Sequence, residues 1–430
     1  MHLTRLASTA ELIVDESSHW AIESYIPLQT NDLIESLLAR EDAAGLDDQK
    51  LKQIFTAMAD LMHYRNRPLH TGFAARYAEI DPDRDSRPIG KASTLTDANA
   101  IDAETANKHR LADARRIAEL GHQVLIDAGY SKVERPELEA AVSQSSEWGV
   151  PLQVDFDVFD LLAVYARGDI IGSRKSRRWR NRFRMTAIDV AVYQRIVVVF
   201  KLREGSMTDD ELEPAMLHLR MFKNVPKVDV DMLLPGTKIR ISWFDRTRTF
   251  GPSLGGIGFQ IYKLLRLAFV VAVVTYSIAT ILLGLLIAII GYAIRSFITY
   301  MQTRNRYMLN LTRSLYYQKL DTNAGVAYRL LFEAESQRHR EAVLAYYAIV
   351  SADGAISLRR LRRRAQRMLR EAAGIEVDFR AADAVKTLES WGVMIRNQNG
   401  DLSVLDPDAA IKQIDRRWDE GPLTSTHQAG

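Results

Sequence analysis

One apolar run constrains this chain more than any other feature. Residues 267–294 read LAFVVAVVTYSIATILLGLLIAIIGYAI, roughly 28 residues without a charge between Arg266 and Arg295. A transmembrane helix needs about 20 apolar residues, each rising ~1.5 Å. Helices buried in globular cores rarely run so long with every face apolar. The sequence therefore predicts an integral membrane protein that crosses the bilayer here.

Two topologies remain open for this run. Either one helix crosses once, or the apolar region from about 253 to 294 forms a short hairpin that keeps both flanking domains on one side. The positive-inside comparison does not decide, because arginines and lysines flank the run on both sides in similar number. Within the run, Gly284 and Ala288 form a small-xxx-small pair, which permits close helix packing and would suit a homodimer.

The remainder of the chain predicts an α+β membrane protein in several parts. Residues 1–80 place apolar side chains at helical spacing and form a helical N-terminal region, and residues 81–106 have the composition of a linker. Residues 107–250 begin with a helix and continue in stretches rich in β-branched and aromatic residues, typical of an α+β domain with an antiparallel sheet. The membrane segment (251–296) then continues into a juxtamembrane helical rod (297–320).

Residues 321–418 follow the element order of a winged-helix domain. Three expected helices precede a terminal β-hairpin around Asn399-Gly400, a strong hairpin signal. The helices are expected at about 324–349, 357–372 and 379–391. Residues 419–430 are expected to form a disordered tail. The sequence therefore predicts a winged-helix-like domain at this end of the chain.

Two basic clusters are the candidate binding sites. The first lies at a strand end or hairpin tip, where basic and aromatic side chains suit anionic lipid headgroups or phosphates: Arg174, Lys175, Arg177, Arg178, Trp179, Arg180, Arg182 and Arg184. A solvated basic turn without a ligand is the competing interpretation. The second lies on the second helix of the winged-helix-like domain and is the candidate contact with a partner: Arg359, Arg360, Arg363, Arg364 and Arg367.

The third helix of that domain is a poor candidate for reading DNA. In DNA-binding winged helices the third helix enters the major groove. Here it offers Arg380 and Lys386 against Asp383 and Glu389, which is less basic than a base-reading helix should be. We therefore expect nucleic acid to be disfavoured as a partner.

Catalytic motifs are not found in the sequence. It has neither a phosphate-binding Gly-x-x-x-x-Gly-Lys-Ser/Thr loop nor a His-Glu-x-x-His pair, and it has no cysteine. The group His63, Tyr64, His70 and Tyr77 has the residue types of a metal or aromatic site, but we interpret it as the amphipathic rim of a helix pair. We expect no catalytic residue, no cofactor and no metal, and the lack of a recognisable motif weighs against enzyme activity without deciding it.

Three stretches resemble the domain-of-unknown-function 3754 family, whose animal relatives are called transmembrane protein 143. They are residues 25–38, 222–246 and 307–347, and the third contains Asn323-Ala324-Gly325-Val326 and Glu333-Ala334-Glu335 in the order the family shows. The resemblance implies an integral membrane protein and supplies no catalytic residues. We interpret Asn323 and Gly325 as capping or turning a helix, with Glu333 and Glu335 in surface salt bridges.

The N-terminus lacks the apolar core of a secretory signal, and its acidic residues argue against a mitochondrial presequence. We therefore expect the bacterial inner (plasma) membrane, with most of the mass in the cytoplasm. The function expected is a membrane-anchored scaffold or sensor of unknown biochemical activity, acting through protein and anionic-lipid contacts. The alternative is a membrane-tethered nucleic-acid-binding regulator, and an enzyme assembled from scattered residues is not excluded by one sequence.

Overall fold

The computed structural model describes the greater part of the chain in two compact units. The described residues are 12–14, 22–40, 46–85, 100–138, 152–153, 155–177, 185–205, 212–214, 216–235, 238–239 and 318–421, with isolated residues between 262 and 302. The larger unit comprises Ala10–Arg135, Phe156–Lys227 and Lys319–Gly430. The smaller unit includes the antiparallel pair β3 (Leu152–Gln153) and β7 (Lys238–Ile239). A 3₁₀ helix, η5 (Lys227–Leu233), begins at the boundary between the units.

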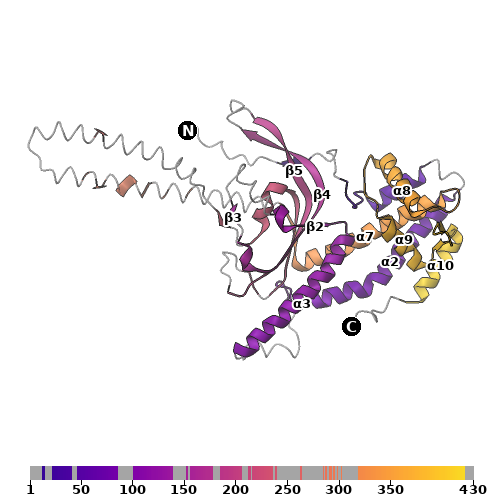
Figure 1. The fold of residues 1–430 in the computed structure, drawn as a ribbon, viewed down its shortest axis with the longest axis horizontal. Coiled ribbons are helices and arrows are strands. Elements are labelled where there is room, and N and C mark those ends of the chain that lie inside the picture. The colour runs from indigo at the N-terminus through magenta and orange to yellow at the C-terminus, as the bar shows by residue number, and fades with distance from the viewer. Residues whose placement is uncertain are drawn as a thin grey trace, which may run out of the picture. The chain divides into compact units, whose positions relative to one another are not determined.

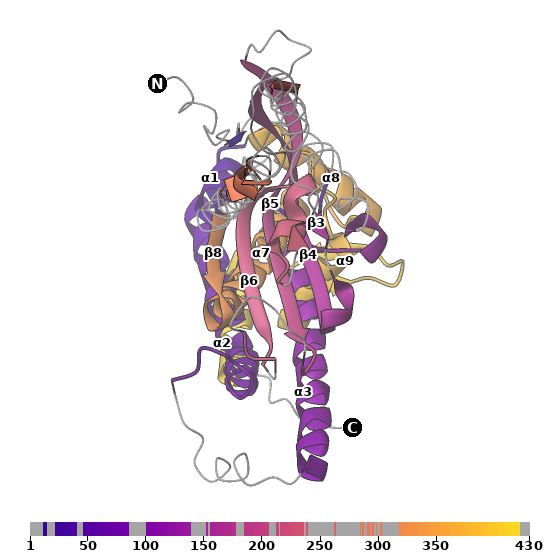
Figure 2. The same ribbon diagram turned by 90° about the vertical axis from the view of Figure 1, so that its left-hand side faces the viewer.

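A six-stranded antiparallel sheet forms one part of the larger unit (Figures 1 and 2). The strands run in the order β1-β4-β5-β6-β8, and β2 pairs with β4 beside that path. Their bounds are β1 Leu12–Val14, β2 Ser131–Val133, β4 Phe159–Arg177, β5 Met185–Leu202, β6 His218–Pro226 and β8 Lys319–Thr322. A short 3₁₀ helix, η3 (Phe156–Val158), precedes β4. All of the pairings are antiparallel, and Val164 of β4 lies opposite Val198 of β5.

The central strand β5 is buried on both faces over its second half. Val197 and Val199 point into a core that also contains Leu219 and Met221 of β6, while the alternate residue Val198 is buried as well. A strand covered on both faces has no polar face to show in its sequence. This is why residues 196–200 read IVVVF rather than alternating apolar with polar residues.

Two long helices and the start of a third pack on this sheet and build its core, the sheet core. They are α2 (Asp48–Tyr77), α3 (Ala100–Asp127) and α7 (Asn323–Val350). The sheet core takes Phe73 and Tyr77 from the end of α2 and Val326 to Leu331 from the start of α7. Asp47 caps α2, its Oδ1 accepting from the backbone N–H of Gln49 at 2.9 Å, which satisfies one of the free amides of the first turn.

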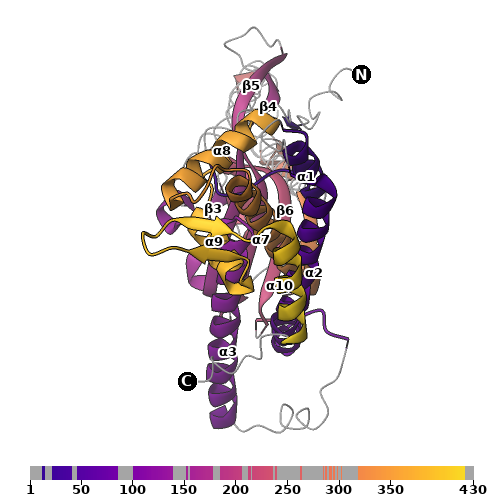
Figure 3. The ribbon, with the colours of Figure 1, turned by 90° about the vertical axis from the view of Figure 1, so that its right-hand side faces the viewer.

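A second core, the helical core, forms around the other half of α7 (Figure 3). It uses Ala342–Ile349 of α7 and Leu51–Met62 of α2, and both helices therefore pass through both cores. The surrounding elements are α1 (Thr30–Leu38), α8 (Leu358–Ala373), α9 (Ala381–Trp391), β9 (Met394–Arg396), β10 (Leu402–Val404) and α10 (Pro407–Asp419). The helix–helix–helix–hairpin order expected for residues 321–418 is thus present, with α10 added.

Glycines in the left-handed conformation end α8 and α9. Gly374 has φ 69° and Gly392 has φ 73°, each just after the last helical residue, where a residue without Cβ adopts this conformation without strain. In the hairpin, the Asn397 side chain accepts from the N–H of Asn399 and of Asp401, and Gly400 has φ 82°. Local turn chemistry therefore sets these element ends.

The transmembrane part of the predicted fold class is corrected by the structure. In the portion of the chain that the structure describes, no helix combines the length and the apolar character that a bilayer crossing requires. The long helices α2 and α7 have 30 and 28 residues, but charged side chains interrupt each of them, so each buries its apolar residues in the protein cores. Most of residues 267–294 lie outside the described residues, as do the hairpin alternative and most of the rod expected at 297–320. The last two residues of that rod, Lys319 and Leu320, belong to strand β8 and not to a helix.

Candidate functional site

The candidate site is a row of arginines on the exposed side of α8. Leu361, Ala365, Met368 and Leu369 are buried in the helical core and fix the orientation of the helix. The arginines at the remaining positions must therefore face outward. We call Arg359, Arg360, Arg363 and Arg367 the arginine face; all four are exposed.

The arginine face carries uncompensated charge. Within the described residues, none of its four guanidinium groups forms an ion pair or a side-chain hydrogen bond. Arg359 and Arg360 lie in the first turn of α8, which has no acidic residue. The helix dipole places partial positive charge at this end, so the arginines add to it instead of opposing it. An anion would be stabilised here by both sources of charge.

The other arginines of α8 have partners inside the protein. Arg362 pairs with Asp378, and Arg370 pairs with Glu376 at 2.9 Å. Arg364, predicted to contact a partner, is half-buried and donates to the carbonyl oxygen of Ser351 at 2.8 Å. It therefore fastens α8 to the end of α7, and the surface available for binding is reduced to the four residues of the arginine face.

The first basic cluster is largely outside the described residues. Arg174, Lys175 and Arg177 are the last residues of β4, but their side-chain positions are not described. Arg178, Trp179, Arg180, Arg182 and Arg184 fall outside the described ranges altogether. Of the predicted helix-packing pair, Gly284 is described as a helical residue and Ala288 is not described.

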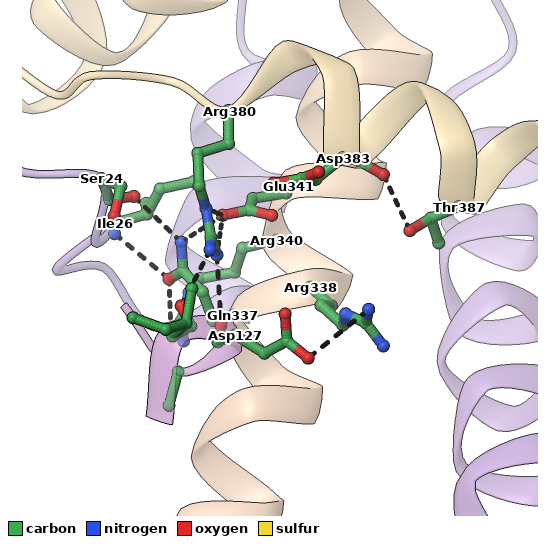
Figure 4. A network of polar contacts seen from close by, with 12 residues as sticks. Ser24, Ile26, Asp127, Gln337, Arg338, Arg340, Glu341, Arg380, Asp383 and Thr387 are labelled. Carbon is green, nitrogen blue, oxygen red and sulfur yellow. Dashed lines mark hydrogen bonds and ion pairs between the residues drawn. The ribbon is translucent and has the colours of Figure 1, made fainter. Parts of the chain in front are cut away.

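A buried polar network fixes α9 against α7 and the end of α3 (Figure 4). The Glu341 carboxylate of α7 is 2% exposed and accepts from Arg380 Nη2 at 2.8 Å and from Gln337 Nε2 at 2.7 Å. Arg380 also donates to the carbonyl oxygens of Ile126 at 2.8 Å and Asp127 at 3.2 Å. Burial raises the pKa of Glu341, and Arg380 opposes that rise.

The same network explains why the third helix is not placed to read DNA. Arg380, the residue that precedes α9, is one of the two cations that the helix offers, and its guanidinium is directed inward to Glu341. The other, Lys386, lies 3.7 Å from Asp383 on the same helix. A helix that reads DNA needs free hydrogen-bond donors for the base edges. Here one of the two cationic side chains, Arg380, is bonded to Glu341 in the interior and is not free to contact a base.

A second charged cluster joins the N-terminal segment, the sheet and α7. Arg167 of β4 is 5% exposed and lies between two aromatic rings, 4.0 Å from the centroid of Tyr25 and 4.4 Å from that of Tyr130. Its Nη1 is 3.1 Å from the Glu333 carboxylate, which also accepts from the Tyr130 hydroxyl at 3.0 Å. Such stacking and ion pairing suit a planar guanidinium.

This second cluster was missed by the sequence reasoning. Glu333 was expected in a surface salt bridge, but its side chain is only 16% exposed. The available signal was the position of Glu333 among residues of α7 with apolar side chains, Leu330, Leu331 and Ala334, and this position does not identify Arg167 or the two tyrosines as partners.

Two histidines flank Glu335, the second glutamate of the Glu333-Ala334-Glu335 stretch. His63 Nδ1 is 3.0 Å from Glu335 Oε1 and His70 Nε2 is 3.6 Å from Oε2. Burial lowers the pKa of His70, and Glu335 opposes that shift. In the described parts of the chain no group of three or more histidine, aspartate or glutamate side chains is arranged to hold a metal ion. Tyr64 stacks on Trp418, and the Tyr77 hydroxyl donates to the carbonyl oxygen of Leu217.

Residues 193–325 match the model of the family described as Protein of unknown function (DUF3754). The matched segment runs from within β5 to the first turn of α7. The family resemblance inferred from the sequence is therefore confirmed for this segment, and the family description names no activity. No solved structure matches the chain.

Proposed function

We propose that this chain, which carries the DUF3754 segment, is a non-catalytic binding protein that docks an acidic surface of a partner protein on its arginine face. It would serve as a scaffold or sensor through this contact. The observation that carries the proposal is the set of four exposed arginines without an acidic partner in the described structure, two of which, Arg359 and Arg360, lie in the first turn of α8, where the helix dipole adds to their charge.

The spacing of the arginine face favours a regular acidic segment. Arg359, Arg363 and Arg367 are four residues apart, so they extend along one side of α8 over about 12 Å. Carboxylates at the same spacing on a partner helix would meet them one by one. The planar guanidinium binds a carboxylate through two parallel hydrogen bonds, which gives each contact a fixed geometry.

The expected affinity is modest and depends on salt. Each exposed arginine–carboxylate pair contributes about 0.2–1 kcal/mol, so four pairs together supply roughly 1–4 kcal/mol. This corresponds to a millimolar dissociation constant at best. Leu358, which is 37% exposed at the start of the helix, could add apolar contact. The partner must therefore contribute further contacts, and the electrostatic part should weaken as salt screens it.

The test measures binding of the full-length chain to a glutamate-rich helical peptide by fluorescence anisotropy at 50 and 500 mM salt. The variant Arg359→Glu/Arg363→Glu should lose binding at low salt, since it reverses two charges of the face. The first-turn change should also stabilise α8 by about 0.3–1 kcal/mol through the dipole, so lost binding would not reflect unfolding.

The matched control is Lys412→Glu/Arg416→Glu, which reverses two exposed charges at the same spacing on α10. It should bind the peptide as the parent does. Equal loss in both double variants would indicate a net-charge effect and contradict the proposal. Tighter binding to a DNA duplex than to the peptide would favour the nucleic-acid alternative, and binding to anionic vesicles alone would favour a lipid.

A further inference from the structure

We propose that a cleft lined by α2, α3, α7 and α9 binds a small molecule that carries a phosphate group. The cleft has a volume of about 400 Å³ and lies next to the network of Figure 4. This volume falls in the range of roughly 300–1,000 Å³ that is typical of small-molecule sites. The inference is independent of the arginine face, because none of its four residues lines the cleft.

The cleft is formed by one polar face of α9 opposite a basic position of α2. On α9, Asp383, Lys386, Thr387 and Ser390 line it. These positions are three, four and seven residues apart, which places them on one side of a helix. On α2, Arg65 lines the opposite wall, and its Nη1 donates to the carbonyl oxygen of Ser390 at 3.3 Å. Charged and hydroxyl groups therefore converge on one space.

Arg65 is the side chain that most needs a ligand. Its Nε is buried and has no hydrogen-bond partner, and no carboxylate pairs with it among the described residues. Burial, followed by the nearby charge of Arg417, lowers the pKa of Arg65. Burial and the neighbouring positive charge of Arg417 both disfavour the charged form of the Arg65 guanidinium. An anion in the cleft would supply the opposite charge that the Arg65 guanidinium lacks.

The other cations of the cleft differ in how well they are paired. Arg338 lies 3.5 Å from the Asp127 carboxylate, and Arg380, which lines the cleft, forms an ion pair with the buried Glu341. Lys386 has Asp383 only at 3.7 Å, and its side chain is 77% exposed. Figure 4 shows the ion pair between Arg338 of α7 and Asp127 of α3. It also shows the hydrogen bond within α9 that the Thr387 hydroxyl donates to the carbonyl oxygen of Asp383. Arg65 and Lys386 are therefore the two charges available to a ligand.

A phosphate monoester fits this arrangement better than a polymer or a neutral ligand. It carries about 1.5–2 negative charges and three strong acceptor oxygens, enough to engage Arg65 and Lys386 together. Apolar side chains of Met62, Ile126 and Trp391 also line the cleft and could contact an uncharged part of the molecule. A cleft of this volume is too small for a nucleic-acid duplex or for a long protein segment.

The test uses the full-length chain and measures thermal stabilisation and calorimetric binding with inorganic phosphate, sugar phosphates and nucleoside monophosphates. At least one organic phosphate should bind more tightly than inorganic phosphate, and Arg65→Gln and Lys386→Gln should each weaken that binding about tenfold or more. Lys52→Gln changes an exposed lysine of α2 that does not line the cleft, and it should bind as the parent does.

Three results would overturn the inference. The first is the absence of stabilisation by any of the phosphate probes at millimolar concentration. The second is equal binding by the parent and both cleft variants. The third is equally tight binding of di- and tricarboxylates, which would reject the phosphate assignment. Because Lys386 is exposed, Lys386→Gln remains an informative variant even if Arg65→Gln fails to fold. The variant Arg359→Glu/Arg363→Glu should bind phosphate normally, which separates this inference from the proposed function.

Discussion

Replacing Arg380 by methionine tests how the buried network stabilises the larger unit. The Glu341 carboxylate is 2% exposed and accepts three hydrogen bonds, at 3.1 and 2.8 Å from Arg380 and at 2.7 Å from Gln337. The change Arg380→Met would leave a buried carboxylate with the single donor Gln337. Breaking a buried pair from one side costs about 3–5 kcal/mol of unfolding free energy, because a charge without a counter-ion stays behind.

The double variant Glu341→Met/Arg380→Met should be much less destabilised than Arg380→Met alone. It removes both charges, and replacing a buried ion pair by apolar side chains of similar volume is often close to neutral. Since Arg380→Met alone costs about 3–5 kcal/mol and the double variant close to nothing, the coupling between the two positions in a double-mutant cycle should be at least about 3 kcal/mol, at or above the upper end of the usual range for residues in contact. Urea denaturation, followed by tryptophan fluorescence at several wavelengths, measures Arg380→Met, Glu341→Met and the double variant against the parent.

The pH dependence of stability provides a second test of the Arg380→Met variant. Burial already holds the pKa of Glu341 above its ordinary value, and Arg380 is the main influence that lowers it. In Arg380→Met the folded protein should bind this proton more tightly than the unfolded chain does. Its stability should then be greatest below the ordinary pKa and decline as the pH rises. A loss below about 1 kcal/mol at pH 8, or no recovery on acidification, would refute the reasoning.

Two further predictions follow from single residues. Asn323→Ala should lower the unfolding free energy by about 2–4 kcal/mol, because Asn323 has φ 48° and its side-chain amide accepts from the Leu219 N–H and donates to the Asp83 carboxylate. Asn323→Gly should recover the share of this loss that comes from the positive φ. Equal denaturation midpoints for the two variants would contradict the separation into a backbone share and a hydrogen-bond share. Burial lowers the pKa of His339, so the folded state resists its protonation and stability should fall as the pH drops below about 6.5. The His339→Gln variant should show a shallower loss between pH 7.5 and 5.5, and an unchanged slope would exclude this histidine as its source.

Elements set by local patterns could be predicted from the sequence. The buried side of α8 was visible in the spacing of Leu361, Ala365 and Met368, and the same spacing places the arginines outside. The hairpin was predicted from Asn399-Gly400, and the structure closes it with a longer loop, residues 397–401, in which Gly400 has φ 82° and the Asn397 side chain accepts two backbone hydrogen bonds. Leu358, which follows the same helical spacing, is partly exposed at the helix start. Helical periodicity thus located the arginine face, although it also included Arg364.

The charged clusters could not be predicted because their members come from distant parts of the chain. Tyr25, Arg167 and Glu333 meet through the packing of the N-terminal segment, β4 and α7, and no local pattern links them. The transmembrane prediction failed for a different reason. Hydropathy scores a segment by its composition alone, and among the helices that the structure describes none is both long enough and apolar enough to cross a bilayer.

The passage of α7 through both cores has a practical consequence for dissecting this protein. A fragment comprising residues 321–418 would keep Ala342–Ile349 but would lose the α1 and α2 side chains that cover them. It would also expose the apolar residues at the start of α7 to water. Such a fragment should precipitate or recruit chaperones, whatever partner it is offered. Deletion mapping would then report misfolding as loss of interaction, so point substitutions on the intact polypeptide are the sounder genetic tool.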